Sequence, residues 1–187
     1  MKFLITGLGN IGAEYEKTRH NIGFKIADAL CKKHKVEFKN ERYAEACHFK
    51  LKGKEITVIK PTTFMNLSGN AVRYWMQKEK ISTNNLLVLV DELALPFGTL
   101  RMKGSGSDGG HNGLKHIQEI LASQQYARLR FGIGNTFLKG KQVDYVLGEW
   151  TDEETKSIEP LINRCVEAIE TYCLAGIEHA MNNLNRK

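Results

Sequence analysis

The sequence predicts one α/β domain, spanning residues 1–187, in which helices enclose a mixed β-sheet. Its length of 187 residues suits a single compact domain with a sizeable core. Strand-like and helix-like segments alternate along the chain, which is typical of α/β folds. The continuous apolar run at 86–90 is typical of a central strand buried on both faces.

Local patterns predict the other elements of the first half. The apolar run at 2–7 is expected to be the opening strand, and apolar residues at helical spacing predict a helix from about 21 to 34. The segments 43–51 and 55–59, separated by a glycine turn, predict a β-hairpin. A proline then ends the second strand, and after a loop Ser68 is expected to cap a helix.

The second half continues the alternation. We expect short strands at 99–103, 129–133 and 143–147. The glycine-rich segment 104–113 is predicted to be the most flexible part of the chain. It precedes a helix with apolar residues at 114, 117 and 121.

The C-terminal region is predicted to be helical. Thr151 and Glu154 have the spacing of a capping box. Pro160 either lies in the first turn of a second helix or kinks one longer helix, and both alternatives remain open. Gly176 is expected to end this region before a last short helix.

Composition narrows the functional classes. The net charge of +6 and the isoelectric point of about 9.1 favour a polyanionic partner such as nucleic acid. No apolar run approaches the length of a membrane span, and the N-terminus resembles a strand more than a signal peptide, so we expect a cytoplasmic protein. We interpret the cysteines as core residues, in preference to metal ligands or disulfides; they are Cys31, Cys47, Cys165 and Cys173.

A glycine pattern follows the first strand. Gly7, Gly9 and Gly12 form a GxGxxG motif, which in dinucleotide-binding folds leads directly into a helix that holds a pyrophosphate. Here the residues after Gly12 are charged, and the helix is expected to begin only near Asn21. We therefore interpret the glycines as a tight turn that positions Asn10 at the strand end.

Several polar residues are predicted to lie at strand ends or in the adjoining loops. Each could by itself serve only as a cap or a turn residue. Because α/β folds gather such groups in a crevice at the carboxyl ends of their strands, we expect one shared cleft. The residues are Asn10, His20, Asn21, Asn66, Asp91, His111 and Asn112.

Five motifs together resemble one known family. The segments GLGNIGAEYEKTRHNIGF, KPTTFMNLSG, LVDELALPFGTLRMK, SDGGHNGLK and LRFGIG are similar to those of bacterial-type peptidyl-tRNA hydrolases, in the family's order and spacing. The resemblance implies a twisted, mixed sheet flanked by helices, a monomer, and an enzyme that needs neither metal nor organic cofactor. Its substrate would be peptidyl-tRNA, with no membrane partner.

The resemblance also implies roles for residues. His20 corresponds to the catalytic base and Asp91 to the carboxylate that orients it, with Asn10 beside them. Lys103 and Arg130 fall where the family holds a tRNA phosphate. The predicted substrate-binding residues are Asn66, Asn112, His111, Asn21, Phe64 and Tyr15. The chain departs from the family pattern at Ile11, Ala94 and Asp108.

These residue types suit ester hydrolysis. Histidine is a natural base near neutral pH, and a carboxylate on its other nitrogen fixes its tautomer. Asparagine amides can hold an oxyanion or a peptide backbone, and this binding does not depend on the side chains of the peptide. Two alternatives stay open: an RNA-binding module that lacks catalysis, and a nicotinamide-dependent oxidoreductase.

Overall fold

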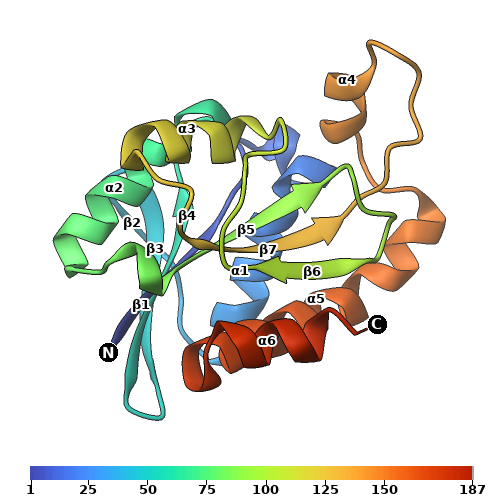
Figure 1. Ribbon diagram of the computed structural model, residues 1–187. Coiled ribbons are helices and arrows are strands. Elements are labelled where there is room, and N and C mark those ends of the chain that lie inside the picture. Colours follow the sequence, from blue (N-terminus) through green and yellow to red (C-terminus); the bar gives the residue numbers. More distant parts are fainter. Residues whose placement is uncertain (187) are drawn as a thin grey trace.

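The computed structural model describes residues 1–186 and has a seven-stranded sheet with helices on both faces (Figure 1). The predicted α/β fold with a mixed sheet is therefore confirmed. The strand order is β2-β3-β4-β1-β5-β7-β6. The strands are β1 (Lys2–Gly7), β2 (Lys39–Glu41), β3 (Ala44–Leu51), β4 (Lys54–Pro61), β5 (Leu86–Glu92), β6 (Leu100–Lys103) and β7 (Ala127–Gly132).

The strand directions determine where loops meet. Strands β4, β1, β5 and β7 run parallel, while β3 and β6 pair antiparallel with β4 and β7. The carboxyl ends of the parallel strands therefore share one edge of the sheet. The loops after β1 and β4 and the end of β5 meet at that edge, which is where the sequence predicted a cleft.

Helices cover the two faces unequally. Helices α1 (Ile22–Lys33), α5 (Asp152–Ala175) and α6 (Ile177–Leu184) pack on one face, and α2 (Ser68–Glu79) and α3 (Asn112–Leu121) pack on the other. Alternate residues of β5 enter the two cores, because side chains alternate along a strand. The single-turn helices are η1 (Ala13–Tyr15), η2 (Arg19–Asn21), η3 (Met65–Leu67) and η4 (Thr83–Asn85), and the short helix α4 (Gln142–Val146) stands away from the sheet.

The glycines at the end of β1 allow this strand and α1 to pack closely against each other. A Cβ atom on Gly7 would lie 2.3 Å from the carbonyl oxygen of Gly23, so the start of α1 rests directly on the end of β1. Helix α1 begins at Ile22, as expected, and not at Gly12. The motif therefore opens no α-helix: only the single-turn helix η1 follows Gly12, and Gly7 and Gly9 lie against Gly23 and Phe24 of the α1 region.

Two local predictions were wrong. Residues 143–147 are not a strand, because Gln142–Val146 form α4, and the hydroxyl of Tyr145 donates to the carbonyl of Ile133. Ser68 does not cap α2: its hydroxyl donates to the Met65 carbonyl, and the cap position belongs to Leu67. The Tyr145 contact joins separate segments, and a local pattern does not reveal it. The Ser68 bond is local, because it reaches only three residues back along the chain.

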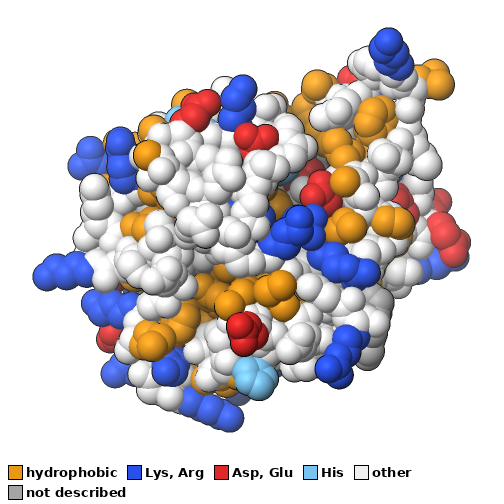
Figure 2. All heavy atoms as spheres, in the orientation of Figure 1, with side chains coloured by type: hydrophobic (Ala, Val, Ile, Leu, Met, Phe, Trp, Pro, Cys, Tyr) orange, Lys and Arg blue, Asp and Glu red, His pale blue; other side chains and the backbone are white. Residues whose placement is uncertain are grey.

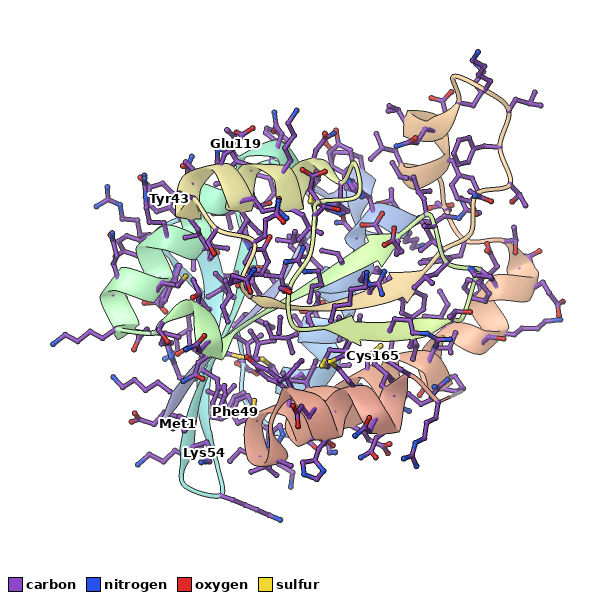
Figure 3. All side chains as sticks on the ribbon, in the orientation of Figure 1. Met1, Tyr43, Phe49, Lys54, Glu119 and Cys165 are labelled. Atoms are coloured by element: carbon purple, nitrogen blue, oxygen red, sulfur yellow. A yellow bond between two sulfur atoms is a disulfide. The ribbon has the colours of Figure 1, made fainter. Side chains whose placement is uncertain are left out.

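The cysteines divide into two pairs. Cys31 on α1 and Cys47 on β3 form a disulfide, which corrects the prediction that all four fill the core as thiols. Helix packing brings these two side chains together, and their sequence spacing gave no sign of it. Cys165 and Cys173 are buried free thiols on α5, as predicted, and Cys165 lies between the sheet and the C-terminal helices (Figure 3).

The C-terminal predictions are confirmed. Thr151 and Glu154 form the capping box of α5, and Gly176 ends this helix. Pro160 lies inside one continuous helix, which decides between the two alternatives. None of the helices within residues 1–186 is both long and apolar enough to cross a membrane.

The contact between α1 and the sheet gives a test of stability. A Cβ on Gly23 would lie 2.5 Å from both the Leu8 nitrogen and the Leu89 oxygen, so Gly23→Ala must displace backbone. We expect the free energy of unfolding to fall by about 2 kcal/mol or more, despite the better helix propensity of alanine. Gly104→Ala is the control, since its Cβ would meet only Ile177, at 3.7 Å. Equal urea midpoints for the two variants would contradict this packing.

Candidate active site

The site is centred on the buried carboxylate of Asp91 at the end of β5, which is 5% exposed. Its Oδ2 lies 2.8 Å from Nδ1 of His20, and its Oδ1 lies 2.8 Å from Nε2 of His111. His20 belongs to η2, and His111 immediately precedes α3. Three segments that are distant in sequence therefore meet at one carboxyl group, as the sequence predicted for His20 and Asp91.

Hydrogen bonds assign the protons of the two imidazoles. Nδ1 of His111 accepts from the backbone amides of Gly113 and Leu114, at 3.1 and 3.3 Å, and so caps α3. His111 must therefore carry its proton on Nε2, which donates to Asp91. His20 donates from Nδ1 to the same carboxylate, which leaves Nε2 of His20 with a lone pair. That free nitrogen is the chemical requirement for a general base.

The contacts between Asp91 and the two histidines shift the pKa values of Asp91 and His20. Burial alone lowers the pKa of His20, but the charge and hydrogen bond of Asp91 outweigh burial and leave it above the ordinary value. Burial alone would raise the pKa of Asp91, but the charges and hydrogen bonds of His20 and His111 hold it well below the ordinary range. Asp91 therefore stays ionised at every pH at which His20 titrates.

Neighbouring residues fix Asn10 in a way that leaves the Nδ2 group of its side chain available to a ligand. Its backbone amide donates to Oδ1 of Asn21, and Nδ2 of Asn21 donates back to the Asn10 carbonyl, both at 2.9 Å. The Met65 amide donates to Oδ1 of Asn10 at 2.7 Å. The Nδ2 group of Asn10 has no protein partner within residues 1–186 and can donate to a ligand. Asn21 is 2% exposed, and both ends of its side-chain amide bind the Asn10 backbone, so it supports Asn10 in place of the predicted contact with substrate.

Other predicted substrate-binding residues are accessible. Phe64 is 52% exposed and precedes η3, which contains the exposed Asn66. Asn112 is exposed at the first turn of α3. Within the described part of the chain, the amides of Asn66 and Asn112 have no hydrogen-bond partner. Tyr15 is half-buried on η1.

Basic side chains gather on β6 and β7. Arg101 lies opposite Arg130 and Lys103 opposite Arg128 in the antiparallel register, so all four side chains project on one face. Helices α2 and α3 cover that face only over the neighbouring strands, and Figure 2 shows Lys and Arg at the centre of this view. Arg130 pairs with Glu92 at 3.3 Å, and Lys103 is exposed.

Sequence reasoning missed the role of Arg128. This arginine is 1% exposed and donates to the carbonyls of Ser107, Gln124 and Tyr126. Gln118 adds a hydrogen bond to the Gly106 carbonyl. These contacts attach the 104–113 segment to β7 and α3, and its predicted flexibility stays a prediction. The alternation in strand 127–132 was the only signal, and it does not tell a buried arginine from an exposed one.

The three central side chains also have the composition of a metal site. His20, Asp91 and His111 offer ligand atoms that all lie within 4.8 Å of one another. The atoms that would face an ion are, however, those joined by hydrogen bonds, and His111 carries its proton there. A metal would have to displace both protons. The expectation of a metal-free site remains a prediction.

Comparisons with known proteins identify the family. A family model described as peptidyl-tRNA hydrolase matches residues 4–187. The peptidyl-tRNA hydrolases of Phocaeicola vulgatus and Bacteroides fragilis are 58% and 57% identical over 187 residues, which is the whole of each chain. This chain belongs to the peptidyl-tRNA hydrolase family.

A solved structure extends this result to the fold. The peptidyl-tRNA hydrolase of Acinetobacter baumannii superposes with a TM-score of 0.93 at 32% identity, covering 98% of this chain and 94% of that one. Membership of the peptidyl-tRNA hydrolase family confirms the resemblance found in the five motifs. Family membership does not by itself assign roles to individual residues.

The His20–Asp91 contact predicts a change in titration. In Asp91→Asn, burial still lowers the pKa of His20 while the raising charge is lost, so this pKa should fall below the wild-type value. The pH dependence of the His20 ring proton shift, followed by NMR, measures it. Asp28→Asn breaks an exposed ion pair with Lys60 and should leave the His20 titration unchanged. An unchanged His20 titration in Asp91→Asn would mean that the carboxylate does not act on this ring.

Proposed function

We propose that this protein hydrolyses the ester bond of peptidyl-tRNA, with His20 as the base, and so recycles tRNA from stalled or aborted translation. The observation that carries the proposal is the His20–Asp91 contact, which leaves Nε2 of His20 available as a base. The known members of the family supply the substrate class. The cytoplasm is the expected location of such a reaction.

The reaction needs an activated water and no protein nucleophile. Nε2 of His20 takes a proton from water as its oxygen attacks the carbonyl carbon of the ester. A tetrahedral oxyanion forms, and the bond from carbon to the ribose oxygen then breaks. The proton held by His20 passes to the departing ribose oxygen, which yields a free peptide acid and an intact tRNA end. Asp91 holds the tautomer throughout and stabilises the imidazolium.

Asparagine amides are suited to stabilise the oxyanion and bind the peptide. Nδ2 of Asn10 is a preorganised donor, because Met65 fixes the other end of the same side-chain amide. The side-chain amides of Asn66 and Asn112, which have no partner in the described part of the chain, can bind backbone groups of any peptide. Phe64 offers an exposed ring for stacking. Binding through backbone groups suits an enzyme that must accept every peptide sequence.

Selectivity for N-blocked substrates follows from the same groups. A peptide presents an amide next to the ester, whereas an unblocked aminoacyl-tRNA presents a protonated amine. An asparagine Nδ2 that donates to the carbonyl of this amide finds no acceptor on the protonated amine, and a site built around a hydrogen bond rejects such analogues strongly.

The tRNA half is expected to bind the basic face of β6 and β7. Lys103 and Arg130 lie there together, and Glu92 holds the Arg130 side chain in place. Contacts of this kind recognise phosphate and carry little sequence information. We further propose that the protein acts as a monomer and without metal or organic cofactor.

The two alternatives differ in what they require. An RNA-binding module on this fold would need the basic face but not a buried carboxylate that orients a histidine. A nicotinamide-dependent oxidoreductase would need a helix that begins at the glycine motif, and α1 begins ten residues after Gly12. The geometry of the site therefore supports the hydrolase.

Cleavage of N-acetylaminoacyl-tRNA tests the proposal. His20→Ala should lower the rate about 10³-fold, because the general base is lost while the tRNA contacts remain. His179→Ala, which removes an exposed histidine on α6, should keep wild-type activity. The wild type should not cleave unblocked aminoacyl-tRNA. Binding of tRNA without cleavage by the wild type would instead support the RNA-binding module.

A further inference from the structure

The residue before His20 is a buried arginine that sequence reasoning left without a role. Arg19 is 7% exposed, and its Nη2 lies 3.1 Å from Oε1 of Glu154 on α5. Its Nη1 donates to the Tyr145 carbonyl at 3.1 Å, and its guanidinium lies over the Tyr145 ring at 4.2 Å from the centroid. A buried arginine held by a carboxylate, a carbonyl and a ring has one fixed position.

Backbone contacts reinforce this connection. The Arg19 amide donates to the Gly148 carbonyl at 3.0 Å, and Thr18 forms an isolated β-bridge with Glu149. A Cβ on Gly148 would lie 3.0 Å from Nη1 of Arg19, so the chain at 148 approaches the guanidinium closely. The segment that carries His20 is thus fastened to the chain between α4 and α5.

Three consecutive residues of η2 bind three different parts of the fold. Arg19 binds the α4–α5 region, His20 binds Asp91 on β5, and Asn21 binds the backbone of Asn10 after β1. Asp91 lies within the sheet and cannot follow a displaced histidine. The position of the His20 ring therefore depends on how firmly η2 is held on either side.

We propose that Arg19 and Glu154 are positioning residues for the base His20. This inference rests on the proposed function, in which Nε2 of His20 activates water. The Arg19–Glu154 pair fixes the N-terminal side of η2. Nδ1 of His20 therefore keeps its hydrogen bond to Asp91, and Nε2 points toward the substrate. Neither residue touches the reacting atoms.

Glu154→Gln is the sharpest variant. Oε1 of Glu154 also accepts from the Thr151 amide, and a glutamine keeps this half of the capping box while losing the charge that holds Arg19. We expect kcat to fall about 10-fold or more, with KM within about twofold of wild type, because small displacements of a catalytic group are costly. Arg19→Lys keeps the charge and should retain more activity than Arg19→Met.

The matched control is Glu170→Gln. Glu170 also lies on α5, and it binds Lys33 and His34 at the far end of α1, each at 2.8 Å. This variant also breaks an ion pair between α5 and the α1 region, but away from η2. It should leave kcat unchanged, whatever its effect on the melting temperature.

The titration of His20 followed by NMR separates this proposal from the proposed function. Among the described residues, the titratable groups that contact His20 are Asp91 and His111. If Glu154→Gln loosens the contact with Asp91, the pKa of His20 falls, and this readout does not depend on activity. An unchanged His20 titration, or a kcat loss no larger than that of Glu170→Gln, overturns the positioning role. A wild type without hydrolase activity overturns the proposed function instead.

Discussion

The site depends on the burial of a single negative charge. A carboxylate 5% exposed at the end of a central strand is costly unless it is fully hydrogen-bonded, and each oxygen of Asp91 is bonded by one imidazole. This requirement connects η2 and the start of α3, which are about 90 residues apart in the chain. The two histidines then differ in function because their other nitrogens meet different partners.

His111 uses its second nitrogen structurally. Nδ1 of this ring accepts from two backbone amides at the start of α3, and a Cβ on Gly113 would lie within 3.0 Å of Leu8, Met65 and His111 atoms. The helix start is thus packed tightly and capped by the ring. Among residues 1–186, Nε2 of His20 has no such partner, so the same carboxylate supports one histidine that builds the site and one that can react.

The sequence predicted the elements and the position of the site well, for identifiable reasons. Apolar runs marked β1 and β5, and polar residues at their ends predicted Asn10 and Asp91 at one edge of the sheet. The relation between Asp91 and His111 was not predicted, because a contact between separate loops has no local pattern. The family resemblance supplied His111 as a site residue but not its hydrogen bonds.

The predictions that were wrong or missing also have physical causes. The segment 143–147 has a short apolar pattern that suits a strand or a helical turn, and contacts with Ile133 and Arg19 favour the helix. Arg19 and Arg128 were overlooked because an arginine in a polar stretch resembles a surface residue until its burial is known. The disulfide of Cys31 and Cys47 depends on helix packing in the same way. What sequence could not supply is long-range side-chain contact.

The most direct test is the tautomer of each active-site histidine, measured from the nitrogen-15 shifts of the two neutral rings. The account predicts opposite tautomers: His20 protonated on Nδ1 with a bare Nε2, and His111 protonated on Nε2 with a bare Nδ1. If His20 instead carries its proton on Nε2, it has no basic nitrogen to offer water. The assignment of His20 as the base would then be contradicted.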